Sequence, residues 1–328
     1  MELLNYDFMQ RALLAALLTG LAAPAIGTYL VHRRLALMGD GIGHVALTGV
    51  AVGLLTGWAP VWTAVVVAIA GAVTIEVVRS YGKASADVAL AMLFYGGIAG
   101  GVLITGLAGS SAATLNTYLF GSITTVSTGD LWVIGGLAVV VIAASIGLAP
   151  QLFAVCQDEE FARACGIPVR LYSIMIAVMA AVTVAVAMRT VGLLLVSALM
   201  VVPVATAMQL TKGFRTTFTL ALCLGVVPSL SGVVFSYYVD VAPGASIVVI
   251  ALAGFILAWP LGTIVRRRVR GRAGGEDPRV TGAHVPTEEH PHEHDEQCGH
   301  PAVTHDDHTD YLHDGHLHAA HGKHYDEH

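Results

Sequence analysis

Residues 170–188 read RLYSIMIAVMAAVTVAVAM and carry one charged side chain, Arg170, at their first position. A helix needs about 20 mostly apolar residues to cross the hydrocarbon core of a bilayer. This stretch has the required length and composition. It predicts a membrane-spanning helix.

The rest of the chain repeats this pattern. Of its 328 residues 55% are hydrophobic and 12% are charged, and the mean hydropathy is +0.70. Soluble domains usually carry about 25% charged residues, so the composition excludes an ordinary cytosolic enzyme. Similar stretches, rich in the small residues that let helices pack closely in lipid, give nine predicted spans: 11–31, 36–57, 60–79, 87–108, 129–149, 170–188, 191–210, 216–238 and 244–265. We therefore predict an all-α polytopic membrane protein with eight or nine transmembrane helices.

The connections between the spans indicate the orientation. Basic residues gather in cytoplasmic loops, and an outside N-terminus with nine helices places every basic cluster in the cytoplasm. These clusters are His32-Arg33-Arg34, Arg79 with Lys83, Arg163 with Arg170, Lys212 with Arg215, and Arg266 to Arg272. Segment 110–128 is too polar to span alone and is expected to be an outside or re-entrant stretch, which the membrane tolerates only if it is buried in protein.

The charge divides the chain into two predicted domains. Residues 1–265 hold ten Lys or Arg and ten Asp or Glu, whereas residues 266–328 hold seven and thirteen, with thirteen of the fifteen His. The net charge of −6 therefore belongs to the tail and does not indicate nucleic-acid binding. Arg266 to Arg272 are explained as a stop-transfer cluster facing anionic lipid. The Gly-, Pro- and His-rich remainder has too few apolar residues to fold, so we expect it to be disordered and cytoplasmic.

Two ionisable residues inside a predicted span are the first candidate site. Asp40 and His44 lie four positions apart in the stretch GDGIGH, 39–44, so a helix would place them on one face. Carboxylate and imidazole together suit zinc or manganese. A homodimer would bring two such pairs together and supply four ligands. The alternative is a hydrogen bond between the two side chains that only hides their polarity.

The second candidate is the polar run 154–168, AVCQDEEFARACGIP. Asp158, Glu159 and Glu160 suit a helix start, and Gly166 followed by Pro168 suits its end. We expect a short cytoplasmic helix that docks a partner, or else a solvated loop helix. The chain has no GxxxxGK[ST] phosphate loop and no hydrolase or dinucleotide motif, so any ATP-driven work must come from another polypeptide.

Five stretches of the membrane part form a joint pattern: His32-Arg33-Arg34 through Asp40 and His44 to Ala51, Leu115 to Gly121, Asp158 to Gly166, Val191 to Ala207, and Tyr237 to Ser246. In these stretches, and in their order along the chain, the protein resembles the permease of metal-uptake ABC transporters, the zinc/manganese/iron family, and most closely its zinc member. The resemblance implies a homodimeric, non-enzymatic permease in the bacterial cytoplasmic (inner) membrane. It also implies two copies of a cytoplasmic ABC ATPase subunit and an extracytoplasmic metal-binding protein as partners. No cofactor is expected to bind permanently, because Zn²⁺ or Mn²⁺ is the transported substrate.

The same resemblance assigns residue roles. The family's pore carboxylate and histidine correspond to Asp40 and His44, and its ATPase-coupling helix corresponds to 156–168, with Asp158, Glu159, Glu160, Ala162 and Gly166. Asp240 corresponds to the stretch between the last two helices and is a candidate at the outer mouth, or only a helix-capping turn.

The His-rich tail departs from the family pattern. His290, His292, His294, His316 and His318 form His-x-His spacings suited to transition-metal chelation. We expect a cytoplasmic metal buffer, or a tail with incidental metal affinity. Imidazole-rich ligands favour zinc over manganese.

Two other classes of function compete with the importer. An ion-coupled carrier or channel would need no ATPase, but it would have no use for a docking helix and would carry more titratable groups inside the membrane. A membrane metal sensor would require the tail for signalling and would show no flux. We therefore predict an ATP-driven importer that works by alternating access.

Overall fold

The computed structural model describes residues 6–80, 86–109, 117–121, 126–188, 191–272, 285–287, 301–305, 308–313, 316–321 and 324–327. The chain divides into two compact units, Met1–Val265 and Arg266–His328.

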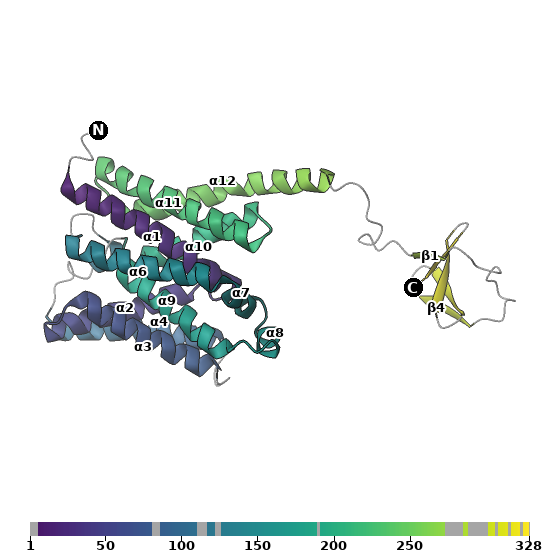
Figure 1. Cartoon of the computed structure of the whole chain (residues 1–328), viewed down its shortest axis with the longest axis horizontal. Helices are drawn as coiled ribbons and strands as arrows, with labels where there is room; N and C mark the ends of the chain where they lie inside the picture. Colours follow the sequence, from purple (N-terminus) through teal and green to yellow (C-terminus); the bar gives the residue numbers. More distant parts are fainter. Residues whose placement is uncertain are drawn as a thin grey trace. The chain divides into compact units, whose positions relative to one another are not determined.

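The first unit is a bundle of long apolar helices (Figure 1). They are α1 (Asp7–His32), α2 (Met38–Thr56), α3 (Pro60–Ser80), α4 (Ala86–Leu107), α6 (Thr128–Gly147), α9 (Val169–Ala187), α10 (Leu193–Leu210), α11 (Phe214–Val239) and α12 (Pro243–Arg272). Of the helices in the described ranges, eight are long and apolar enough to cross a membrane, and α10 contains a shorter apolar stretch. The predicted all-α polytopic class is confirmed. Each predicted span overlaps one of these helices, and the main difference is that α12 continues past residue 265 to Arg272.

Local signals explain where the helices begin and end. Ser127 caps α6 in a capping box: its hydroxyl accepts from the backbone N–H of Asp130, and the Asp130 carboxylate accepts from the Ser127 N–H. Helix α2 ends at Gly57 in the left-handed conformation (φ +74°), and Pro60 then opens α3. Helix α1 ends with Arg34 in that same conformation, unusual for a residue with a Cβ.

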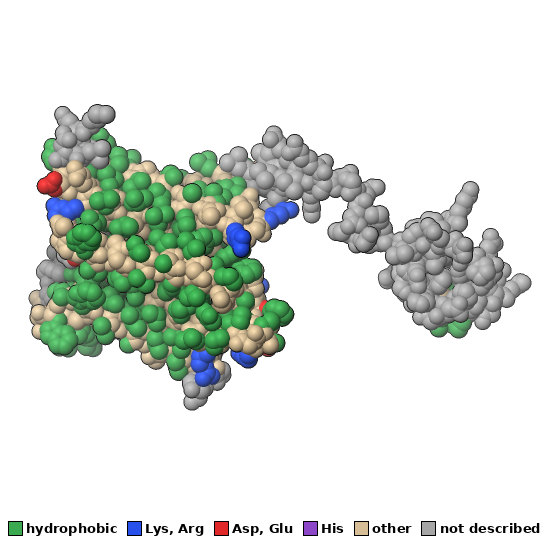
Figure 2. All heavy atoms as spheres, viewed as in Figure 1, with side chains coloured by type: hydrophobic (Ala, Val, Ile, Leu, Met, Phe, Trp, Pro, Cys, Tyr) green, Lys and Arg blue, Asp and Glu red, His purple; other side chains and the backbone are tan. Residues whose placement is uncertain are grey.

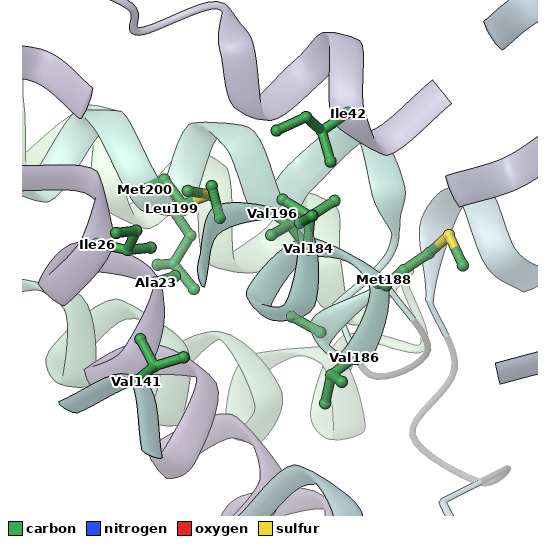
Figure 3. Packing of buried hydrophobic residues seen from close by; sticks show 14 of the residues in the cluster. Ala23, Ile26, Ile42, Val141, Val184, Val186, Met188, Val196, Leu199 and Met200 are labelled. Atoms are coloured by element: carbon green, nitrogen blue, oxygen red, sulfur yellow. The ribbon is translucent and has the colours of Figure 1, made fainter. Parts of the chain in front are cut away.

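The core lies where α1, α2, α9 and α10 meet (Figure 3). Ile26 of α1, Ile42 of α2, Val184 of α9 and Met200 of α10 are almost fully buried. Two glycines set the closest crossings. A Cβ at Gly27 would lie 2.0 Å from the Met200 carbonyl oxygen, and one at Gly225 of α11 would lie 2.3 Å from the Gly20 carbonyl oxygen. Small residues thus permit backbone contact, as in other membrane bundles.

The flanks of the bundle are covered mainly by hydrophobic side chains, and charged groups lie near its ends (Figure 2). Val66, Val102, Val139 and Val249 are each exposed by 60% or more. Such a surface suits lipid contact rather than water.

Part of segment 110–128 is described, namely residues 117–121 and 126–128. A Cβ at Gly192 would lie 2.4 Å from the Phe120 carbonyl carbon, and one at Gly244 would lie 3.1 Å from the Phe120 oxygen. The backbone near Phe120 therefore packs closely against the starts of α10 and α12. The Phe120 side chain itself remains 43% exposed, so this packing involves the backbone and does not bury the segment.

The second unit contains strands where the composition predicts disorder. They are β1 (Val285–Thr287), β2 (Ala302–His305), β3 (His308–His313), β4 (His316–His321) and β5 (His324–Glu327), in the antiparallel order β1-β5-β4-β3-β2. Two residues separate β3 from β4, and they are Asp314-Gly315, a dipeptide that favours a tight hairpin. The register places His305 opposite His308, His313 opposite His316 and His321 opposite His324.

Candidate functional site

Asp40 and His44 lie in the first half of α2, where the glycine-rich sequence lets neighbouring helices come close. A Cβ at Gly41 would lie 3.0 Å from Leu93 of α4, and one at Gly43 would lie 2.4 Å from Leu193 of α10. Asp40 is half-buried, and its Oδ1 accepts a hydrogen bond of 3.3 Å from the Ser197 hydroxyl of α10. Asp40 therefore contacts α10, and His44 contacts Phe94 of α4.

His44 is 7% exposed, and its ring packs edge-on against Phe94 of α4 with 4.6 Å between ring centroids. Its Nδ1 atom is buried and has no hydrogen-bond partner among the described residues. Buried polar atoms usually have a partner, so this nitrogen is a candidate ligand-binding atom. The predicted alternative, in which His44 and Asp40 only satisfy each other, does not account for the Nδ1 atom.

One copy of the chain supplies an incomplete set of metal ligands at this place. Within the ranges that the structure describes, no group of three or more His, Cys, Asp or Glu side chains could hold a metal ion. A closed structural zinc site needs four ligands. Asp40 and His44 of one copy are therefore too few to form a closed site.

The predicted cytoplasmic helix over 156–168 is two helices in the structure, α7 (Ala149–Gln157) and α8 (Glu159–Ala164). The break falls at Asp158, whose carboxylate accepts 2.9 Å hydrogen bonds from the backbone N–H groups of Glu160 and Phe161. A strong N-cap at this position starts a new helix instead of continuing α7.

The end of α8 follows the predicted signal. Gly166 adopts φ +78°, and the backbone N–H of Ile167 reaches back to the carbonyl of Ala162. This is a Schellman ending, in which a left-handed glycine closes the helix. Ala162 is fully buried against Val155 and Val169, whereas Glu160 and Phe161 are exposed. The 65% exposed Phe161 gives α8 an apolar outward-facing side chain.

The inward-facing side of α8 joins a buried cluster of four charges that the sequence analysis did not predict. Glu159 accepts a hydrogen bond from Arg33 at the end of α1, and its Oε1 lies 3.1 Å from the Arg79 Nη2 of α3. Arg79 also binds Glu76 at 2.7 Å, and the Arg33 Nη2 lies 3.9 Å from the Glu76 Oε1. We call Arg33, Glu76, Arg79 and Glu159 the charge cluster. Its two cations and two anions cancel.

Burial is deepest at the centre of the charge cluster, where the side chains of Arg33 and Glu76 are 3% and 2% exposed. Burial of the Glu159 carboxyl raises its pKa, but attraction by Arg33 and Arg79 and their hydrogen bonds outweigh burial, so the pKa is lowered. One signal for the cluster was present in the sequence: Glu76 is an acid within a predicted span, and such residues are usually functional.

The other predicted site residues do not join these groups. Asp240 is exposed and caps the end of α11 in a left-handed conformation (φ +53°). His316 and His318 lie on β4, and their side chains are not described. His290, His292 and His294 lie outside the described residues. A hollow of about 340 Å³ opens beside Trp62 and Asp130, near the starts of α3 and α6, and none of the candidate residues lines it.

A bundle of long lipid-facing helices with a separate short helix at one end defines a polytopic membrane subunit. Residues 5–261 match the ABC 3 transport family. The chain belongs to that family, as the resemblance predicted, and its relatives are membrane permease subunits rather than enzymes.

Two relatives and one solved structure illustrate the similarity. The chain is 36% identical over 267 residues to a "Probable metal transport system membrane protein" of Treponema pallidum, covering 81% of this chain and 100% of that one. It is 36% identical over 279 residues to the "Manganese transport system membrane protein MntC" of Halalkalibacterium halodurans, covering 84% and 95%. The structure of PsaBC from Streptococcus pneumoniae in complex with Fab matches with a TM-score of 0.71 and 29% identity, covering 78% and 92%.

Proposed function

We propose that this chain is the membrane permease of an ATP-driven importer that moves a divalent transition metal, Zn²⁺ or Mn²⁺, across the bacterial cytoplasmic membrane by alternating access. The observation that carries the proposal is the buried Nδ1 atom of His44, which has no hydrogen-bond partner among the described residues and lies on the same helix as Asp40. The names of the relatives support a metal as cargo.

Asp40 and His44 would give the ion a carboxylate oxygen and an imidazole nitrogen as it passes. Because a single copy offers too few ligands to retain a metal, the ion can leave again. A homodimer whose two-fold axis runs near α2 would add a second pair and make four ligands. Ser197 would orient the Asp40 carboxylate through its hydrogen bond.

The two proposed protein partners would bind at opposite ends of the helix bundle. The exposed face of α8, with Glu160 and Phe161, would dock a cytoplasmic ATPase subunit, since the chain lacks a phosphate loop of its own. Asp240, at the opposite end of α11 from Phe214, would lie at the outer mouth, where a metal-binding protein delivers the ion. The Arg266 to Arg272 cluster would face anionic lipid, which leaves the tail in the cytoplasm.

One observation favours manganese as the transported metal, and another favours zinc. Manganese is named for one of the two relatives above. The tail favours zinc, because it holds thirteen of the fifteen histidines, some in spacings such as His316-x-His318, and imidazole suits zinc better than manganese. We propose that the tail buffers metal leaving the pore.

The test is metal uptake into vesicles by the permease with its ATPase and binding protein, with Zn²⁺, Mn²⁺ and Fe²⁺ in competition. We expect ATP-dependent uptake that Asp40→Ala abolishes while ATPase binding persists, and that truncation after Arg272 only reduces. The preferred ion identifies the cargo. Equal uptake without the ATPase, or normal uptake by Asp40→Ala, would contradict the proposal.

A further inference from the structure

The charge cluster is the largest group of buried ionisable side chains in the described part of the chain that the proposed metal path does not use. It joins three elements that are distant in sequence: the end of α1, the end of α3 and the start of α8. Isolated buried charges are costly, and removing one partner leaves the others unpaired. The charge cluster therefore links α8 to α1 and α3.

The α1 side of the cluster leads directly to the candidate metal pair. Arg33 follows the last residue of α1, and α2 begins five residues later at Met38. The connection is tight: the backbone N–H of Leu35 binds the Leu30 carbonyl at 2.9 Å, and that of Met38 binds the Leu35 carbonyl at 2.9 Å. These hydrogen bonds link the backbone around Arg33 to the start of the helix that carries Asp40.

The α3 side of the cluster reaches the same place by packing. Gly71 lies five residues before Glu76 on α3, and a Cβ there would lie 2.7 Å from the Val45 Cγ1. Val45 directly follows His44. A helix moves largely as one body, so a shift of Glu76 would also move Gly71 and press on Val45, the neighbour of His44.

We infer that Glu159 is a positioning residue for transport, which acts through Arg33, Glu76 and Arg79 to pass the displacement of α8 to the helix bearing Asp40 and His44. This inference rests on the proposed function and assigns different roles to the two faces of α8. The outward side chains Glu160 and Phe161 contact the ATPase, and the inward Glu159 transmits the movement.

The experiment compares Glu159→Gln with Phe161→Ala in proteoliposomes that contain permease, ATPase and binding protein. Glu159 is suitable because its side chain, at 36% exposed, is the most exposed of the charge cluster, and the glutamine amide oxygen can still accept a hydrogen bond from Arg33. The replacement therefore disturbs the fold less than a change at the 2% exposed Glu76. We expect Glu159→Gln to retain ATPase binding but to lower the metal transported per ATP hydrolysed about tenfold, as loss of one charge-assisted hydrogen bond would allow. Phe161→Ala should instead weaken ATPase binding.

Two further variants make the result specific. Glu159→Asp keeps the charge and should restore much of the transport ratio. Arg215→Gln removes an exposed cation in the first turn of α11, outside the charge cluster, and should leave the ratio unchanged. A Glu159→Gln ratio equal to that of the unmodified protein, or a loss explained by failed ATPase binding, would overturn the inference alone. Unmodified vesicles without ATP-driven uptake would overturn the proposed function together with it.

Discussion

For the candidate metal pair, the sequence predicts the relative placement of Asp40 and His44 but not the residues that surround them. The spacing of Asp40 and His44 predicts a shared helix face, and both lie on α2. The contacts that define their surroundings, Ser197 and Phe94, come from α10 and α4. No local pattern links residues so far apart in the chain, so these neighbours could not be predicted.

Two cysteines near α8 should differ sharply in reactivity. Cys156 is 7% exposed, and burial raises its pKa to about 12 even though Arg33 opposes this, with Glu159 adding to the rise. Because the thiolate is the reactive form, Cys156 should resist a maleimide at neutral pH. Cys165, at the end of α8, is exposed and should react.

The measurement uses variants that each retain only one of these cysteines. A membrane-impermeant maleimide should label Cys165 in inside-out vesicles and not in right-side-out vesicles, and Cys156 in neither until the protein unfolds. Labelling of Cys165 from the outside would contradict the predicted orientation. Equal labelling rates for the two cysteines would contradict the burial of Cys156.

At the scale of elements, hydrophobicity and caps predict most of the bundle. The predicted spans 60–79 and 170–188 differ from α3 and α9 by one residue at most at either end. Helix α7 was missed as a separate element because its nine residues are too few for a clear apolar period. The charge cluster was missed because its members are up to 126 positions apart.

Close helix crossings should make some glycines irreplaceable. At Gly27 a new Cβ would lie 2.0 Å from a backbone oxygen of α10, so Gly27→Ala must separate the helices. We expect Gly27→Ala to lower the free energy of unfolding by about 1–3 kcal/mol, as at other overpacked sites. Gly254→Ala in α12 is the matched control, because nothing lies within 4 Å of a Cβ there. Thermal unfolding in detergent distinguishes them, and equal melting temperatures would argue against the α1–α10 contact.

The ending of α8 depends on backbone conformation rather than on space. A Cβ at Gly166 would meet nothing within 4 Å, but φ is +78°. Gly166→Ala should therefore destabilise the turn by about 1 kcal/mol and lower the metal transported per ATP. Gly147→Ala, at the end of α6 and also unobstructed, should do neither. If both variants behave alike, the Schellman ending does not matter for transport.

Across the whole molecule, the charge cluster predicts how stability depends on pH. The folded-state pKa of Glu159 lies below its ordinary value of about 4.3. The contribution of Glu159 to the free energy of unfolding is therefore complete above about pH 4.3. It disappears as the pH falls through the lower pKa of the folded state. Because the Glu159 side chain is partly exposed to solvent, we expect this contribution to stability to be only about 1 kcal/mol.

The check is the difference in melting temperature between the unmodified protein and Glu159→Gln, measured in detergent across a pH series. The difference should stay constant from neutral pH to about pH 5 and shrink only in stronger acid. Arg215→Gln serves again as the control. A difference that grows with acidity would mean that the carboxyl is not held in its charged form.

The short connection between α1 and α2 restricts how the gene for this protein can change over evolutionary time. Seven positions separate Arg33, held by Glu76 and Glu159, from Asp40 in the first half of α2. Each residue inserted or deleted there would turn Asp40 and His44 by about 100° around the helix axis, away from Ser197 and Phe94. We therefore expect related genes to keep the length of this interval and to carry their insertions and deletions elsewhere.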